Sequence, residues 1–361
     1  MSKKIRLLYM EGVSPLRSQT VYHAVAYAMK EDSPNTIIMV SPNAPYVCIG
    51  YHQDMQKEVD MEYVQANGLT VLRREVGGGA VFLDNGQLFT QWIFHKSDLP
   101  SSLEERFKFY IDPLIATYQA LGINANHRPI NDVHVNGKKI GGTGAAQMGI
   151  AEVVVGSLMY TFDKKTMSKV LKVPSEKMRD KIFESLEAYM TTMTEELGAS
   201  PDRTMVKDLY MKKVSEALGA EVYEGEWTAD EEAMAQEIDA RFMSDEWLYQ
   251  KGRLQQQGVK IHQDIHVVEA AFKSQGGLIR VIARLREGRI DDVAISGDFT
   301  LLPSFALGAL EQSIRGLSAT PETLKSKIEE AYYRLSIQSP GVTPADFTTA
   351  IMNAVAPPQP V

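Results

Sequence analysis

Hydrophobic residues along this chain follow two spacings, which divide the sequence into strands and helices. Alternation and short apolar runs predict strands, whereas apolar residues every three to four positions predict amphipathic helices. The pattern predicts strands over 5–10, 36–40, 46–49, 69–73, 80–83, 88–94 and 152–162. It predicts helices from Ser14-Pro15 onward and over 61–66, 101–121, most of 164–218 and most of 229–247.

The character of the sequence changes near residue 250. Strands are expected over 256–267, 278–286 and 289–296, followed by helices over 304–314 and 321–335. This run has the size of a small α+β domain, and a length of 361 residues favours two domains. We therefore expect a larger domain over 1–248, a smaller one over 249–345 and a tail over 346–361.

Composition narrows the class of protein. Lysine and arginine number 38 against 46 acidic residues, which gives a net charge of −8 and argues against a nucleic-acid binder. The one cysteine, Cys48, cannot form an intramolecular disulfide or a zinc cluster. No apolar run has the length of a signal segment or a membrane span. We expect a cytoplasmic protein with no membrane partner.

The first candidate site is Arg73-Arg74 followed by Gly77-Gly78-Gly79, directly after a predicted strand. Guanidinium groups bind carboxylate and phosphate through a rigid set of donors. Three glycines let the backbone approach a ligand closely, and they would give nothing to a solvated strand end. We therefore expect a pocket for an acidic small molecule here.

The second candidate site is a hairpin over 133–140 that leads into Gly141-Gly142-Thr143-Gly144. Its Asn136-Gly137 pair tolerates the positive φ angles of a type I′ turn. Lys138 and Lys139 would point to opposite faces of the returning strand, so only one can face a ligand. We expect Lys139 to neutralise phosphate and polarise an acyl oxygen.

Other site types fit less well. No P-loop sequence occurs, and Gln147 replaces the third glycine of a dinucleotide fingerprint. Cys48 lies in an apolar run and is expected to be a core residue rather than a nucleophile. The alternation of His262, Asp264 and His266 could gather metal ligands on one strand face, but histidines on exposed strands are common.

The two glycine motifs resemble those of the lipoate–protein ligase A family, within the biotin/lipoate ligase and octanoyltransferase superfamily. The family pattern is close to RRxxGGGAVxHDxGN followed by an ND…K(I/V)xG element. Here the corresponding residues are 73–87, Asn131-Asp132 and 139–142, and 49–54 is similar to the IGxxQN segment of the family. The resemblance covers almost the whole chain, since the region after 250 is similar to the accessory domain of bipartite ligases.

The resemblance implies an α+β fold, a mixed sheet flanked by helices as in biotin and lipoate ligases, with a smaller C-terminal accessory domain. It implies an ATP-dependent lipoate–protein ligase that uses Mg²⁺ and forms lipoyl-AMP from free lipoate. The lipoyl group would then pass to a lysine of an acceptor lipoyl domain, such as a dehydrogenase E2 subunit or a glycine-cleavage H-like protein. We expect a monomer.

Site residues follow from the same resemblance. Lys139 would be catalytic. The lipoyl group would be bound by Arg74, Gly77, Gly78, Gly79, Val81 and Gly142. ATP and the adenylate would be bound by Arg74, Gly79, Phe82, Leu83, Asn131, Asp132 and Lys139. Magnesium would sit on the phosphates, with Asp132 as its candidate protein ligand.

Two departures keep other functions open. Leu83 stands where the family usually has histidine, and Gln87 where asparagine is common. Leu83 makes an octanoyl or lipoyl transferase with a pre-activated acyl donor conceivable, and the choice between lipoate and octanoate stays open. Cys48 does not lie where cysteine-dependent octanoyltransferases carry their nucleophile. A third class is a non-catalytic protein that binds lipoyl domains.

Overall fold

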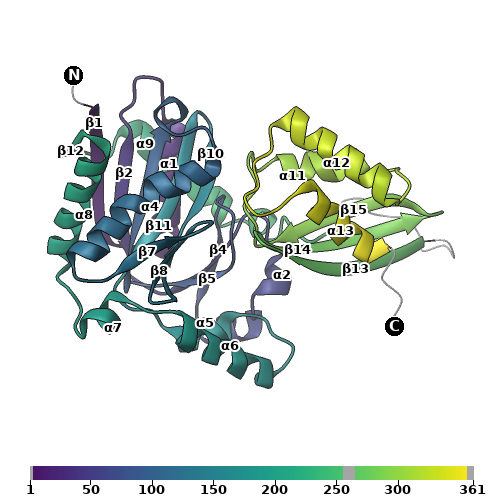
Figure 1. Ribbon diagram of the computed structural model, residues 1–361, viewed down its shortest axis with the longest axis horizontal. Coiled ribbons are helices and arrows are strands. Elements are labelled where there is room, and N and C mark those ends of the chain that lie inside the picture. Colours follow the sequence, from purple (N-terminus) through teal and green to yellow (C-terminus); the bar gives the residue numbers. More distant parts are fainter. Residues whose placement is uncertain (1–2, 255–264, 356–361) are drawn as a thin grey trace. The chain divides into compact units, whose positions relative to one another are not determined.

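The computed structural model describes residues 3–254 and 265–355. Contacts within the chain divide it into two compact units (Figure 1). The first unit comprises Met1–Cys48, Val59–Arg73 and Val81–Ser244. The second comprises Ile49–Glu58, Arg74–Ala80 and Asp245–Val361. The second unit therefore includes two short segments from the N-terminal half, one of which carries the three glycines. The domain boundary at 248/249 stays a prediction.

A mixed six-stranded sheet forms the centre of the first unit. Its strand order is β10-β11-β6-β2-β1-β12. The strands are β1 (Lys3–Val13), β2 (Thr36–Pro42), β6 (Gln87–His95), β10 (Gly144–Met148), β11 (Ala151–Met159) and β12 (Ala220–Glu224). Strand β1 runs parallel to β2 and β12, whereas β2, β6, β11 and β10 pair antiparallel in succession. All seven residues of β2 are buried, as expected for a strand covered on both faces.

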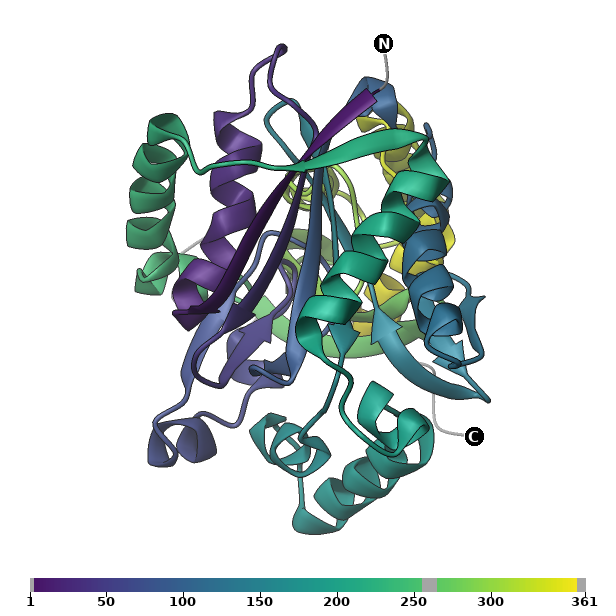
Figure 2. The ribbon, with the colours of Figure 1, turned by 90° about the vertical axis from the view of Figure 1, so that its left-hand side faces the viewer.

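Helices cover both faces of this sheet. Figure 2 shows α1 (Pro15–Ala28) and α9 (Ala229–Phe242) on one face, and α4 (Leu103–Ala120) and α8 (Arg203–Leu218) on the other. Helix α1 begins where Ser14-Pro15 predicted, because the Ser14 side chain accepts the N–H of Arg17 at 3.1 Å. The remaining helical segments of the unit are α3 (Met61–Ala66), the 3₁₀ helix Lys96–Asp98, α5 (Lys164–Val170), α6 (Glu176–Tyr189) and α7 (Met193–Leu197).

Two small three-stranded sheets carry the predicted site residues of the first unit. One has the order β4-β3-β5, formed by Thr70–Arg73, Tyr46–Ile49 and Val81–Leu83. The other has the order β7-β8-β9, formed by Ala125–Arg128, Asp132–Val135 and Lys138–Gly142. The sequence pattern does not predict strands β7, β10 and β12, because each is short and has few alternating apolar residues.

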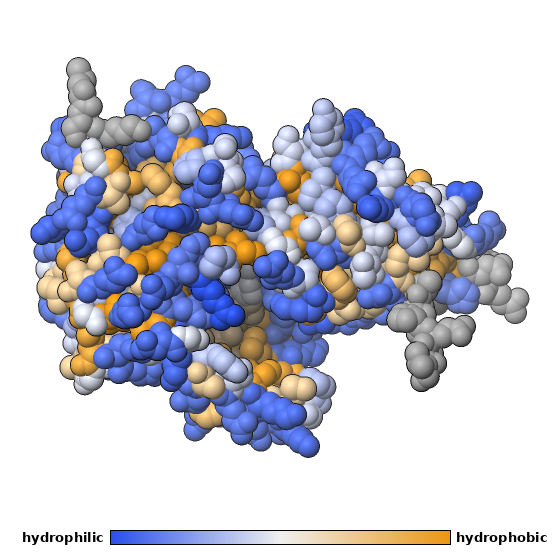
Figure 3. All heavy atoms as spheres, viewed as in Figure 1, coloured by the Kyte–Doolittle hydropathy of each residue, from blue (hydrophilic) through white to orange (hydrophobic). Residues whose placement is uncertain are grey.

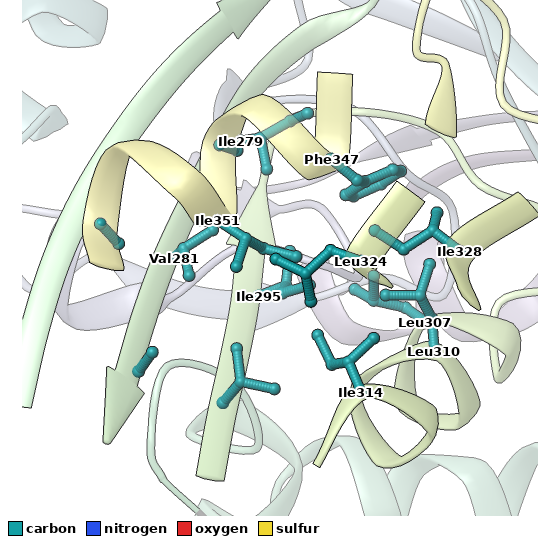
Figure 4. Close-up of a cluster of buried hydrophobic side chains, with 14 of the residues drawn as sticks. Ile279, Val281, Ile295, Leu307, Leu310, Ile314, Leu324, Ile328, Phe347 and Ile351 are labelled. Atoms are coloured by element: carbon teal, nitrogen blue, oxygen red, sulfur yellow. The ribbon is translucent and has the colours of Figure 1, made fainter. Parts of the chain in front are cut away.

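The second unit packs helices onto a three-stranded antiparallel sheet, β13-β14-β15. The strands are Ile265–Ser274, Gly277–Arg286 and Arg289–Gly297, and the helices are α2 (Met55–Glu58), α10 (Asp245–Leu248), α11 (Ala306–Ile314), α12 (Pro321–Leu335) and α13 (Pro344–Val355). Figure 4 shows Ile279, Val281 and Ile295 of the strands gathered in one cluster with Leu310, Ile328 and Phe347 of the helices. In the view of Figure 3, hydrophilic and intermediate residues cover most of this unit.

The predicted tail requires a correction. Residues 346–355 belong to helix α13, and Phe347, Ala350, Ile351 and Ala354 pack in the core of the second unit. The three-to-four spacing of these residues is that of an amphipathic helix, and it was hidden beside the proline-rich residues 356–360. The first part of the predicted strand 256–267, including His262 and Asp264, lies outside the described residues; His266 lies in β13.

Across the described residues, no helix combines the length and apolar character needed to cross a membrane.

Candidate active site

The hairpin of β8 and β9 forms as predicted, with the expected turn. Asn136 and Gly137 have φ angles of +50° and +84°, the two positive values that a type I′ turn requires. Val135 pairs with Lys138, and His134 pairs with Lys139. A bulge between Val133 and His134 then shifts the register, so that Asp132 opposes Gly142.

Lys139 and Asp132 form an ion pair on this hairpin. Lys139 Nζ lies 2.8 Å from Asp132 Oδ1, and the two side chains are 38% and 29% exposed. Both groups are thus partly shielded yet accessible to a ligand. Gly142 leaves room for the pair, because a Cβ atom added there would lie 2.8 Å from Lys139 Nζ and 3.3 Å from Asp132 Oδ1.

The main chain of Lys139 is held from a different part of the sequence. Its carbonyl oxygen accepts the N–H of Thr191 at 2.9 Å, and Lys139 forms a parallel bridge with Met190 just after helix α6. These contacts fix the backbone of the lysine, and the ion pair with Asp132 holds its ammonium group. Local sequence patterns do not indicate this support, because Met190 and Thr191 are distant from Lys139 in the chain.

His134 is a further polar residue of the site that the motifs did not include. Its Nε2 lies 3.8 Å from Asp132 Oδ2, a pair that is ionic only when the imidazole is protonated. His134 and Asp132 are two positions apart on β8, and residues two apart share one face of a strand. The spacing of two between Asp132 and His134 in the sequence therefore predicts that both side chains lie on the face of the site.

Asn131 closes the base of the hairpin. Its side-chain amide donates a hydrogen bond to the carbonyl of Thr143, and its own carbonyl accepts both the N–H of Thr143 at 2.9 Å and the hydroxyl at 3.0 Å. These contacts attach Asn131 to Thr143, the first residue after β9. They favour a structural contribution of Asn131 alongside the predicted contact with nucleotide.

The segment 74–80, termed the glycine loop below, is held by its own arginine. Arg74 Nη2 donates to the carbonyl oxygens of Gly77 and Gly79 at 2.9 and 2.8 Å. The guanidinium group thus spans the loop and fixes its curvature. The preceding Arg73, at the end of β4, has no exposed surface, so only Arg74 of this pair retains partial exposure.

Val81, Phe82 and Leu83 form β5 and pair with β3 through Cys48, Val47 and Tyr46. Phe82 is buried, and its N–H donates to the sulfur of Met167 at 3.2 Å, so its side chain is part of the core. Val81 and Leu83 are half-buried on the other face. Those two side chains are therefore the better placed of the three for ligand contact.

The turn after β5 explains further residues of the motif. Asp84 Oδ1 accepts the N–H of Gly86 at 2.8 Å, and burial raises the pKa of the Asp84 carboxyl. A Cβ atom on Gly86 would lie 2.2 Å from Thr161 Oγ1, so this glycine is required by packing. Asp84 and Gly86 thus build the turn.

Taken by unit, the predicted residues form two groups. Asp132, Lys139 and Gly142 lie together in the first unit, with Asn131 at the hairpin base. Arg74 and the three glycines lie together in the second unit. Within the described residues there is no group of three potential metal ligands. Cys48 lies on β3 with no exposed surface, which is unsuited to a nucleophile.

Comparison with known proteins bears on the fold and the site. Residues 14–215 match the family model described as the lipoyl protein ligase A/B catalytic domain. The lipoate-protein ligase A subunit 1 of Thermoplasma acidophilum is 29% identical over 253 residues, which cover 67% of this chain and 95% of that protein. The octanoyltransferase LipM of Kyrpidia tusciae is 28% identical over 272 residues, covering 68% and 98%.

Solved structures are similar as well. A bipartite lipoate protein ligase of Thermoplasma acidophilum, solved in a study with its E2 lipoyl domain, gives a TM-score of 0.63 at 27% identity, covering 68% of this chain and 96% of that one. The structure of P. falciparum LipL1 in complex with lipoate gives a TM-score of 0.68 at 13% identity, covering 92% and 95%. The expected fold class, including the smaller C-terminal domain, is confirmed.

Proposed function

This chain belongs to the lipoyl protein ligase A/B catalytic-domain family, and on that premise we propose that it is an ATP-dependent lipoate–protein ligase. In the first step, a carboxylate oxygen of free lipoate attacks the α-phosphorus of ATP, and the bond to pyrophosphate breaks. In the second, the amine of an acceptor lysine attacks the acyl carbon of lipoyl-AMP. An amide forms, AMP leaves, and the amine loses a proton.

The ion pair of Lys139 and Asp132 is the observation that carries this proposal. Both steps create negative charge on oxygen, first on phosphate and then on the acyl carbonyl, and neither needs a protein nucleophile. A fixed ammonium group stabilises such charge most in a partly shielded site, because little reorganisation is needed. Asp132 holds the ammonium in place at 2.8 Å, and Gly142 leaves the space that it occupies.

The predicted site residues offer one carboxylate for Mg²⁺. Protein-bound Mg²⁺ is usually held by one or two carboxylates together with substrate phosphates and water. Asp132 is the carboxylate that would hold it here, and the ion would offset phosphate charge. Residues Asn131, Phe82, Leu83 and Arg74 belong to the same proposal as neighbours of the adenylate, with Val81 and the glycine loop along the lipoyl group.

The acceptor in this proposal is a lipoyl domain, since a relative of similar fold was studied with its E2 lipoyl domain. The second unit would act as the accessory domain of the ligase, and the protein would act as a monomer. Residues 245–355 lie beyond the 14–215 match, which supports a bipartite organisation in a single chain.

A second candidate function is an octanoyl or lipoyl transferase that uses a pre-activated acyl donor. The octanoyltransferase LipM is as similar to this chain as the ligase subunit is, and Leu83 departs from the usual histidine. The buried Cys48 disfavours a covalent form of this reaction, because a thiol without exposed surface cannot reach an acyl donor.

Pyrophosphate release from Mg-ATP by the full-length protein separates the two functions. We expect release that depends on free lipoate, and amide formation on an added lipoyl domain. A parallel reaction supplies octanoyl thioester of an acyl carrier protein without ATP. Acyl transfer from the thioester, with no pyrophosphate release, would contradict the ligase function and show that the protein is a transferase. Binding of the lipoyl domain with neither activity would favour a non-catalytic binding protein.

A further inference from the structure

The three glycines of the glycine loop have three different surroundings. Gly78 has a φ angle of +93°, which side-chain-bearing residues rarely adopt. Gly79 has space for a side chain, because an added Cβ atom would lie 3.7 Å from Asp298 Cβ, an ordinary contact distance. Gly77 is crowded, because its added Cβ atom would lie 2.9 Å from both Phe299 O and Thr300 Cα.

The crowding at Gly77 comes from protein backbone. The neighbouring segment, residues 297–300, begins at Gly297, the last residue of β15, and is termed the 297–300 turn. A flexible side chain could move aside, but the Phe299 carbonyl and the Thr300 α-carbon can move only if the turn moves. The absence of a side chain at Gly77 therefore allows close packing of the loop on the turn.

Hydrogen bonds and ring packing reinforce this contact. The Gly78 N–H donates to Phe299 O at 3.4 Å, and the Gly297 N–H donates to His52 O at 2.9 Å. The rings of His52 and Phe299 stack with centroids 5.2 Å apart and an interplanar angle of 17°. The neighbour of His52, Tyr51, donates its N–H to Val76 O at 3.0 Å.

The 297–300 turn is itself anchored in the second unit. Phe299 has no exposed surface and belongs to the hydrophobic core of that unit, where its ring meets Phe347 edge-on. The carboxylate of Asp298 accepts the N–H of Leu278 at the start of β14. Packed interiors resist small displacements, so the turn is a firm support for the loop.

We propose that Gly77 is a positioning residue: its packing against the 297–300 turn sets the conformation of the glycine loop and thereby the activation of the acyl substrate. The activation part rests on the proposed function, whereas the packing part does not. A change in the turn is transmitted to the loop through Gly77 and Gly78, and from there to the loop carbonyls that Arg74 binds.

Three full-length variants test the proposal without substrates. Gly77→Ala introduces the clash, Gly79→Ala adds the same methyl group in ordinary contact, and Asp298→Ala loosens the turn without adding bulk. Hydrogen exchange is measured by mass spectrometry in peptides that contain Gly78 and Gly297. We expect exchange to accelerate about tenfold or more in Gly77→Ala and Asp298→Ala, the factor for about 1.4 kcal/mol. Gly79→Ala should leave exchange unchanged.

Unchanged exchange in both Gly77→Ala and Asp298→Ala, or equal acceleration in Gly79→Ala, would overturn the proposal. If Gly77→Ala does not fold, Asp298→Ala decides alone. Lipoate-dependent pyrophosphate release then tests the activation part, and kcat is expected to fall in Gly77→Ala and Asp298→Ala. Gly308→Ala in α11, where nothing lies within 4 Å, is the activity control. Absence of release in the unmodified protein would refute the ligase function and leave the exchange result standing.

Discussion

Lys139 Nζ lies 2.8 Å from Asp132 Oδ1, although neither residue opposes the other in the hairpin. Asp132 is opposite Gly142, and Lys139 is opposite His134. The lysine side chain runs diagonally over Gly142 to reach the carboxylate, which diagonal neighbours on one sheet face allow for long side chains. The pair therefore depends on the register shift, at which Ile140 of β9 is the extra residue.

Replacement of Lys139 by alanine should remove most activity. Loss of one fixed donor to a developing oxyanion typically lowers kcat by about 100- to 1,000-fold. Lys138→Ala is the matched control, because it deletes the same chemical group from the neighbouring position of β9. Pyrophosphate release should collapse in the first variant and persist in the second. Similar rates in both would show that Lys139 is not catalytic.

Gly142→Ala should impair activity with little change in stability. The new methyl group would displace the Lys139 ammonium, which is the flexible end of a side chain, rather than the backbone. Reduced pyrophosphate release with an unchanged urea midpoint is the expected result. Gly141→Ala is the comparison, since its added Cβ atom would be 3.6 Å from the nearest atom. A large drop in the midpoint of Gly142→Ala would instead indicate a structural role.

The ion pair of Arg106 and Glu152 should matter for folding rather than catalysis. Arg106 Nη1 lies 2.7 Å from Glu152 Oε2, and both side chains are almost fully buried between α4 and β11. Arg106→Leu leaves a buried carboxylate without its partner, which costs about 3–5 kcal/mol of unfolding free energy. Urea unfolding measures this loss. The double variant with Glu152→Leu should recover part of it, and no recovery would contradict the ion-pair explanation.

Glu311 should make stability depend on pH. Burial raises the pKa of its carboxyl, against the favourable charges of Lys251 and Arg315 and the N–H of Ile295 at 2.7 Å; Asp292 adds to the rise. The folded state therefore binds this proton more tightly than the unfolded state. The resulting stability is fully present below the unfolded pKa of about 4.3 and is lost as pH rises through the folded value.

Glu311→Gln removes this dependence, because the amide does not titrate and its oxygen can still accept the Ile295 N–H. Urea unfolding of both proteins from pH 4 to pH 8 measures the difference. We expect the stability of the parent protein relative to Glu311→Gln to decline as pH rises. A difference that grows with pH would show that the raised pKa is wrong.

Much of the fold and site could be predicted from local sequence. Ser14-Pro15 starts α1, and Asn136-Gly137 forms the hairpin turn, because each acts on residues within a few positions. The glycine and ND…K motifs predicted the family, which is confirmed. The motifs do not include His134, and the pattern predicts a tail where α13 lies, because the apolar face of that helix borders a proline-rich end. The roles of individual site residues remain predictions.

The sequence by itself determined the positions of turns, helix starts and glycine motifs, since backbone preference and hydrophobic spacing act locally. Only the tertiary structure decided what each glycine is near. Gly77 meets Phe299 and Thr300, Gly142 makes room for Lys139, and Gly50 would clash with Gly78 O if it carried a Cβ atom. A glycine has no side chain to indicate its partner. Its role depends on which distant backbone the packed core brings against it.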